Sequence, residues 1–150
     1  MNLFLDANVL FSASLSASGA AQALLVAAKA AGAECVCSER AFAEAHRNLA
    51  SKAPQSLPNL ELMSVLVSRV PEPHVTQIDA ARGAGVVEKD APVLGAALAC
   101  GADGFVTGDL RHFGHWFGHQ VDGVLVLPLR AAVDRLTAGP APRTIRGPAK

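Results

Sequence analysis

The chain has 150 residues, 51% of them hydrophobic, which suits one domain with one sizeable core and makes a second domain unexpected. Its 13 basic residues balance 13 acidic ones, so the formal net charge is zero and gives no general attraction to nucleic acid. The start of the chain has no basic segment, and no run of about 18 apolar residues occurs, which disfavours a signal peptide and a membrane span.

The first third of the chain predicts two strands and two helices. A short apolar run at residues 2–5, closed by turn-forming residues, indicates a buried first strand. Residues 20–31 are rich in Ala and Leu and are followed by glycine, which predicts a helix and its end. Residues 35–37 predict a second strand, after which Ser38 is placed to cap a helix that extends to about residue 50.

The middle of the chain is less regular. Residues 51–59 have the composition of a loop, and residues 60–67 are moderately helical. A connection interrupted by Pro71 and Pro73 follows. The segment that begins at Lys89 opens a helix through Cys100, with proline in its first turn and glycine just past its end.

The last third predicts two more strands and a helix. Residues 105–107 and 124–127 indicate strands, and Pro128 starts a helix that ends near Thr137. Strands that alternate with helices imply a parallel sheet covered on both faces, because parallel neighbours need crossover connections. We expect residues 1–137 to form this α/β domain and residues 138–150, which are basic and rich in proline, to be a disordered tail.

The three cysteines, Cys35, Cys37 and Cys100, have neither an even count nor the Cys-x-x-Cys spacing of a zinc site. Buried free thiols are therefore expected. Together with the missing signal peptide, they indicate a reducing cytoplasm.

Four carboxylates stand where strands or loops pass into helices. Asp6 and Asp109 each follow a predicted strand, so both belong at the carboxyl edge of a parallel sheet. Asp90 begins a helix that can reach this edge, and Glu44 lies in the helix capped by Ser38. Asp103 precedes its strand and would lie about 20 Å from Asp109, which excludes it from a shared site.

Turn or cap roles explain each acid singly, but Ser, Thr or Asn would serve those roles equally well. Charge at all four positions favours ligand chemistry, since crowded carboxylates repel each other unless a cation neutralises them. The sequence therefore predicts an oxygen-rich site for a divalent cation such as Mg²⁺, suited to phosphate chemistry. Helical periodicity does not decide between Glu39 and Glu44, because Glu44 lies outside the predicted buried face of the helix, which Phe42, Ala45 and Leu49 mark.

Four segments of the chain, in order, resemble those of the PIN-domain family: LDANVL, SERAFAEAHRNL, KDAPVLGAAL and GADGFVTGDLRHF. The resemblance covers nearly all of residues 1–135. It implies a three-layer α/β/α sandwich with a central, mostly parallel sheet, and cleavage of single-stranded RNA with Mg²⁺ or Mn²⁺ as cofactor. The catalytic and metal-binding acids implied by the resemblance are Asp6, Glu44, Asp90 and Asp109, with Asn8 and Thr107 as polar supports.

In the mechanism that we expect, Asp6 and Asp109 hold the main ion. Glu44 and Asp90 place a second ion or the attacking water. Small single-domain members of the family, the VapC-like ones included, are toxins of bacterial toxin-antitoxin pairs and form dimers. The resemblance therefore implies an RNA substrate, a cognate antitoxin protein and a homodimer.

Two other interpretations keep the fold: a housekeeping RNA-processing nuclease and a non-catalytic module that binds a partner. The complete acid set argues against the second. A Rossmann-type small-molecule protein is disfavoured, because no G-x-G-x-x-G follows the first strand.

The segment RHFGHWFGH, residues 111–119, has more histidine and aromatic residues than the resemblance leads us to expect. The spacing of His112, His115 and His119 would suit zinc on one helical face, although two glycines disfavour a regular helix there. The aromatic residues Phe113, Trp116 and Phe117 suit either base stacking or packing in the core or a dimer. The basic residues that flank the acids and are candidates to hold an RNA backbone are Arg40, Arg47, Lys89 and Arg111.

Overall fold

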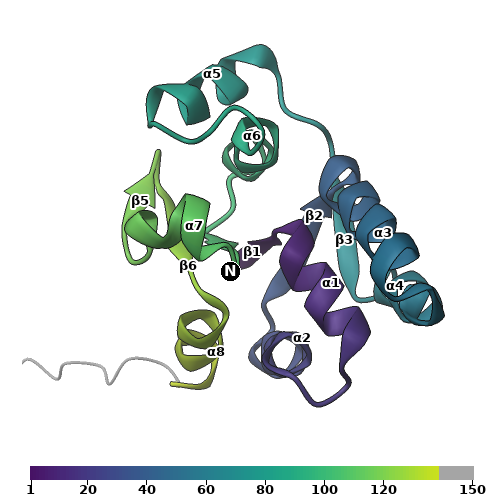
Figure 1. Ribbon diagram of the computed structural model, residues 1–150. Coiled ribbons are helices and arrows are strands. Elements are labelled where there is room, and N and C mark those ends of the chain that lie inside the picture. The colour runs from purple at the N-terminus through teal and green to yellow at the C-terminus, as the bar shows by residue number, and fades with distance from the viewer. Residues whose placement is uncertain (139–150) are drawn as a thin grey trace, which may run out of the picture.

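A six-stranded sheet in the order β3-β2-β1-β4-β6-β5 forms the centre of this computed structural model, which describes residues 1–138 (Figure 1). All neighbouring strands in this order are parallel except β5 and β6, which pair antiparallel. The strands are β1 (Asn2–Leu5), β2 (Glu34–Ser38), β3 (Val67–Val70), β4 (Gly104–Val106), β5 (Gln120–Val121) and β6 (Val124–Leu127).

Helices cover both faces of the sheet. The helix α5 packs on α6, and α2 packs on α8; in Figure 1 the first pair lies at the top and the second at the bottom. This arrangement confirms the predicted three-layer α/β/α sandwich. The α-helices are α1 (Ala7–Leu15), α2 (Ala20–Ala31), α3 (Glu39–Lys52), α4 (Leu57–Met63), α5 (Val75–Gly83), α6 (Ala91–Ala99), α7 (Leu110–Phe113) and α8 (Leu129–Thr137). Two short 3₁₀ helices are η1 (Pro54–Ser56) and η2 (Gly114–Trp116).

The central strands form the core because both of their faces are covered. Phe4 on β1 and Phe105 on β4 are register partners, and their rings stack with centroids 5.8 Å apart. Both side chains are fully buried. Burial of one such side chain contributes about 1.5–3 kcal/mol relative to exposure. The pairing of β1 with β4 fixes the relative position of the two loops that follow these strands.

Several predicted boundaries are confirmed at the level of single contacts. The Ser38 side chain accepts a hydrogen bond from the Ala41 backbone N–H at 3.2 Å and caps α3. Gly32 ends α2 with a φ of 70°, a left-handed conformation that glycine adopts without a Cβ clash. Strand β1 and strand β6 have the predicted limits, and α8 ends at Thr137 as expected.

The loop predicted for residues 51–59 is wrong. Helix α3 continues to Lys52, and η1 and α4 follow almost without a break. Pro54 and Pro58 lie in the first turns of η1 and α4, where a missing backbone N–H breaks no helical hydrogen bond. These prolines therefore start helical turns instead of marking a loop.

Two elements between residues 60 and 88 were not predicted. The moderately helical run at residues 60–67 ends as a helix at Met63, and Val67 begins the edge strand β3. Helix α5 lies in the segment after Pro73. Its first turn is held by a reciprocal pair of hydrogen bonds between His74 and Gln77. This local capping pattern lacks the usual Ser, Thr or Asp at the N-cap, so little in the sequence indicates the helix.

All three cysteines are free, as predicted, but only two are buried: Cys35 and Cys37 in β2 are buried, whereas Cys100 is partly exposed. Burial raises the pKa of the Cys35 and Cys37 thiols to about 11. Within residues 1–138, no single helix is long and apolar enough to span a membrane; α1 and α2 meet that criterion only as a pair bent by 102°. The predicted tail lies outside the described residues, apart from Ala138.

Candidate functional site

The four predicted acids line one depression at the carboxyl edge of the sheet. Asp6 directly follows β1, Asp109 follows β4, Asp90 is the N-cap residue of α6, and Glu44 lies on α3. The depression has a volume of about 290 Å³ and is lined by Asp6, Ala7, Asn8, Glu44, Asn48, Lys89, Asp90, Gly108 and Asp109. Four segments far apart in the sequence therefore bring their carboxylates to one place.

A hydrogen-bond network joins the loop after β1 to the loop after β4. Asp6 Oδ2 accepts hydrogen bonds from Thr107 Oγ1 at 2.8 Å and from Asn8 Nδ2 at 3.0 Å. Asn8 Oδ1 in turn accepts from the Gly108 backbone N–H at 2.7 Å, and Thr107 Oγ1 accepts from the Asp109 N–H at 3.1 Å. Asn8 and Thr107 thus fix the orientation of Asp6 relative to the loop that carries Asp109.

Asp6 is the most buried of the four acids, with 8% of its surface exposed. Burial raises the pKa of Asp6 to about 6, although hydrogen bonds from Thr107 and from the Ala7 N–H act in the opposite direction. The negative charges of Glu44 and Asp90 raise this pKa further. A cation in the depression would lower it, because it would favour the ionised carboxylate.

Asp90 and Asp109 converge on one histidine. The Nδ1 atom of His112 lies 2.9 Å from Asp90 Oδ2 and 2.9 Å from Asp109 Oδ2. Burial raises the pKa of Asp90, an effect that His112 opposes. Asp90 Oδ2 and His112 Nδ1 are enclosed, yet within residues 1–138 neither has a hydrogen bond of acceptable geometry. Enclosed carboxylate and imidazole atoms that lack partners fit a divalent cation.

Two of the four acids also have an ordinary structural role, because their side chains cap helices. Asp6 Oδ1 accepts from the Ala7 N–H at 2.8 Å, and Asp109 Oδ1 accepts from the His112 N–H at 3.0 Å, so both carboxylates cap helices. Each still has a second oxygen directed elsewhere. Asp90 makes no side-chain capping bond, so capping does not explain it.

The structure separates the other acids from this depression. Glu39 forms an ion pair with Arg69 on the neighbouring strand, so of the two candidates on α3 only Glu44 lines the depression. Asp103 accepts a hydrogen bond from the Asn2 N–H at the opposite end of the strands, as expected.

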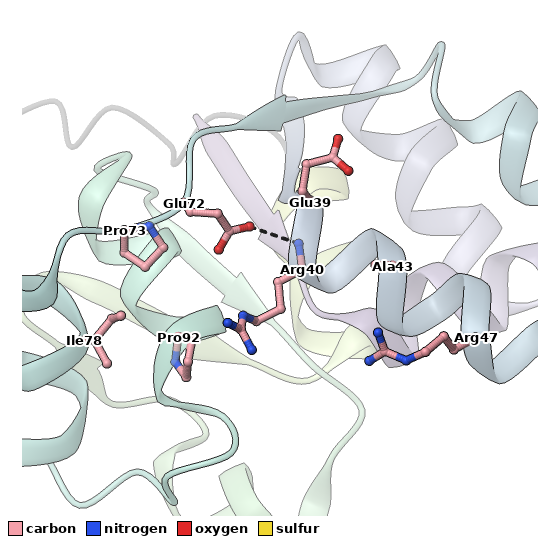
Figure 2. A pocket seen from close by; sticks show the side chains of 8 residues that line it. All are labelled: Glu39, Arg40, Ala43, Arg47, Glu72, Pro73, Ile78 and Pro92. Atoms are coloured by element: carbon pink, nitrogen blue, oxygen red, sulfur yellow. Dashed lines mark hydrogen bonds between the residues drawn. The ribbon is translucent and has the colours of Figure 1, made fainter.

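A second hollow, of about 460 Å³, lies between α3, the segment that leads into α5, and the helices α5 and α6 (Figure 2). Arg40 and Arg47 extend into it from α3, opposite a partly apolar wall that includes Ile78 and Pro92. Within the described part of the chain, neither guanidinium has a carboxylate within 4 Å. The nearby Glu72 instead accepts a hydrogen bond from the Arg40 backbone N–H at 3.0 Å. The hollow therefore presents two guanidinium groups without carboxylate partners, beside Glu72 and beside Glu39, which pairs with Arg69.

The other two basic candidates differ in position. Lys89 lines the acidic depression, whereas Arg111 is on α7 and does not line it.

Asn48 also lines the depression and was not predicted. Its position one turn after Glu44 on α3 was the available signal.

The three-histidine zinc site is not formed. Helix α7 has only four residues before η2 begins, so His112, His115 and His119 do not share a continuous helical face. Among residues 1–138, the only group of three or more potential ligands is Asp90, Asp109 and His112. Sequence reasoning about the three histidines missed the contacts of His112 with the acids, because those contacts depend on the turn that follows Asp109.

The aromatic residues of the same segment belong mainly to the core. Phe113 is buried, with its ring centroid 5.1 Å from that of Phe105. Trp116 and Phe117 are partly buried and pack against the core. Packing therefore explains these side chains without a role in stacking bases.

A parallel α/β sandwich with carboxylates gathered at one sheet edge defines a class of proteins whose sites suit hard divalent cations. The family model described as "PIN domain" matches residues 2–111, and the chain belongs to that family. PIN domains are generally nucleases.

One similar solved structure is the crystal structure of VapBC2 from Rickettsia felis bound to a DNA fragment from their promoter. The match has 16% sequence identity and a TM-score of 0.64, and it covers 85% of this chain and 98% of the other. At this identity the likeness supports the fold. Among curated proteins, no relative matches this sequence.

Proposed function

We propose that this protein is an endoribonuclease that cleaves single-stranded RNA with Mg²⁺ or Mn²⁺ and acts as the toxin of a bacterial toxin-antitoxin module. One observation carries the proposal: four carboxylates from four separate segments line one depression in a fold whose family generally consists of nucleases. Burial, and after it the negative charge of neighbouring acids, raises the pKa of Asp6 and of Asp90. A bound cation would offset both effects, which supports the proposal.

A divalent cation bound in this depression supplies a water of lowered pKa and neutralises charge on the phosphodiester. Asp6 and Asp109 hold the main ion, and Glu44 and Asp90 place a second ion or the attacking water. Thr107 and Asn8 hold Asp6 in orientation through the hydrogen bonds given above. Orientation of this kind preserves the geometry that in-line attack requires.

The RNA backbone lies along α3 in this proposal. Arg40 and Arg47 lie one turn before and about one turn after Glu44 on this helix, and both enter the hollow of Figure 2. Guanidinium groups bind phosphates with paired hydrogen bonds, so free arginines beside the acidic depression suit a chain of phosphates. Lys89 contributes positive charge at the depression itself.

The proposed partners are a cognate antitoxin protein and a second copy of this chain, in the cytoplasm. Similarity in fold to a VapBC2 chain supports the toxin role. A short open reading frame next to the gene, whose product relieves growth arrest when co-expressed, would support it further. Housekeeping RNA processing would instead give no arrest on expression.

The central test is cleavage of a single-stranded RNA by purified protein with Mg²⁺ or Mn²⁺, and its loss in EDTA. We expect Asp6→Asn and Asp109→Asn to lower the rate at least 100-fold. Asp134→Asn, an exposed acid on α8, is the matched control and should leave the rate unchanged. Full metal-dependent activity in Asp109→Asn would refute the assignment, and a wild-type protein without activity would leave only a partner-binding role.

A further inference from the structure

His112 contacts two acids of the depression through the local geometry of the chain after β4. Asp109 caps the four-residue helix α7 by accepting from the His112 N–H at 3.0 Å. This turn folds the histidine ring back over its own cap residue, three positions earlier, and toward Asp90 at the start of α6. The Nδ1 atom is thereby 2.9 Å from one oxygen of each carboxylate.

The contact is not satisfied as a set of hydrogen bonds. Nδ1 carries at most one proton and can donate to only one oxygen, so the second carboxylate receives nothing from it. Among the described residues, neither His112 Nδ1 nor Asp90 Oδ2 has a hydrogen-bond partner of acceptable geometry, although both atoms are enclosed. If Nδ1 carries no proton, its lone pair faces two negatively charged oxygens.

The spacing of the same atoms suits a shared ion. The potential ligand atoms of Asp90, Asp109 and His112 all lie within 4.8 Å of one another. Adjacent ligands of an octahedral ion with bonds of about 2.1 Å lie about 3 Å apart, close to the distances from Nδ1 to the two oxygens. An ion placed among the three atoms would satisfy both of the enclosed ones.

We propose that His112 is a metal ligand that joins Asp90 and Asp109 in a mixed nitrogen and oxygen site with a preference for Mn²⁺ over Mg²⁺. This inference rests on the proposed function and refines it, because it joins Asp109 of the main ion and Asp90 to one ion together with His112. Mg²⁺ is a hard ion that prefers oxygen ligands and keeps its waters, whereas imidazole suits transition metals. One imidazole in the site therefore discriminates between the two cofactors that the acids alone would accept.

The direct test is pulsed electron paramagnetic resonance of the full-length protein loaded with Mn²⁺, after ¹⁵N labelling of its histidines. We expect the coupling of one directly bound imidazole nitrogen in the unaltered protein. The coupling should disappear in His112→Gln and persist in His115→Gln, which changes a histidine three residues away that is not grouped with Asp90 and Asp109. If His112→Gln folds poorly, the absence of nitrogen coupling in the unaltered protein still overturns the inference, and loss of the coupling in His115→Gln would assign it to the wrong histidine.

Affinity provides a second measurement. We expect His112→Gln to weaken Mn²⁺ binding at least tenfold, while Mg²⁺ binding, measured by competition, changes less than about threefold. An equal loss for both ions would show that His112 only positions the carboxylates, and would overturn the inference.

The outcomes separate this inference from the proposed function. Mn²⁺ bound without nitrogen coupling, in a protein that still cleaves RNA, refutes the role of His112 and keeps the nuclease. A protein that binds neither ion refutes both. Nitrogen coupling in a protein that fails to cleave RNA supports the site and refutes the proposed activity.

Discussion

Asp6 illustrates a conflict between stability and ion binding in one residue. Its carboxylate is 8% exposed and lies near Glu44 and Asp90, so the ionised form is disfavoured by burial and by like charge. The same features prepare it to bind a cation, because the ion regains the free energy that ionisation costs the metal-free protein.

This conflict gives a pH-dependent prediction. The pKa of Asp6 is about 6 in the folded protein, above the value of about 3.9 in an unfolded chain. Its contribution to stability is therefore fully present below pH 4 and is lost as the pH rises through 6. In EDTA, Asp6→Asn should raise the free energy of unfolding at pH 7.5 by about 1–3 kcal/mol and leave it nearly unchanged at pH 4.

Urea unfolding at the two pH values measures this difference, with Asp134→Asn as the control for loss of an exposed acid. With saturating Mn²⁺ the order should reverse, since the ion stabilises only the protein that binds it well. A less stable Asp6→Asn protein at pH 7.5 in EDTA would contradict the prediction.

At the residue scale, the sequence indicated which acids come together better than it indicated the contacts that surround them. Asp6 and Asp109 follow strands, so the parallel topology alone brings them to one edge. The approach of His112 to Asp90 depends on the capped turn after Asp109, and the helical spacing of the histidines does not reveal it. The sequence did not separate Glu44 from Glu39. Glu39 instead pairs with Arg69, which lies on β3, a strand that was not predicted.

At the scale of elements, helices α5 and α6 approach each other closely at Gly95. A Cβ at this position would lie 3.2 Å from the Ile78 backbone N and 3.3 Å from the Gln77 carbonyl carbon. Both are backbone atoms of α5, which cannot move aside as a flexible side chain would. The glycine in α6 therefore sets the distance between α5 and α6, the helix whose N-cap residue is Asp90.

We expect Gly95→Ala to destabilise the protein by about 1–3 kcal/mol, because the added methyl group forces α5 away from α6. Gly83→Ala, at the end of α5, is the matched control, since no atom lies within 4 Å of the place that its added methyl group would take. Thermal or urea unfolding of both variants tests the prediction. Equal stabilities would show that the two helices separate at little cost and would refute it.

The elements that sequence analysis identified are those with strong local signals. The apolar strands β1 and β6, the capped helix α3 and the helix α6 with proline in its first turn were all predicted near their true limits. Strand β3 has one buried residue at its start and more exposed ones after it, and α5 is weakly amphipathic, so neither stood out. Both depend on packing against neighbours that are distant in sequence.

At the scale of the whole molecule, a net charge of zero hides an uneven distribution. Acids converge on one depression, while Arg40 and Arg47 face the adjacent hollow without carboxylate partners among the described residues. An anionic chain would be repelled from the acids and attracted to the hollow beside them. Binding of RNA should therefore depend on these two arginines despite the neutral total.

We expect Arg40→Gln/Arg47→Gln to weaken binding of a short single-stranded RNA and to reduce its dependence on salt. Each lost phosphate contact lowers the slope of log affinity against log salt by about 0.7, so the double variant should lose about 1.4. Fluorescence anisotropy in EDTA, which prevents cleavage, measures both quantities. Arg130→Gln/Arg135→Gln on α8 is the control with the same change in charge, and an identical slope for the two double variants would refute the assignment.

The two ends of the sheet limit how copies of this protein assemble. One edge, β3, carries exposed Arg69, which pairs with Glu39 and lies over the Phe42 ring; the other, β5, is only two residues long. Short or charged edges do not template the growth of a sheet from one molecule into the next. We therefore expect the folded domain to associate through surfaces other than its two edge strands, without intermolecular β-pairing.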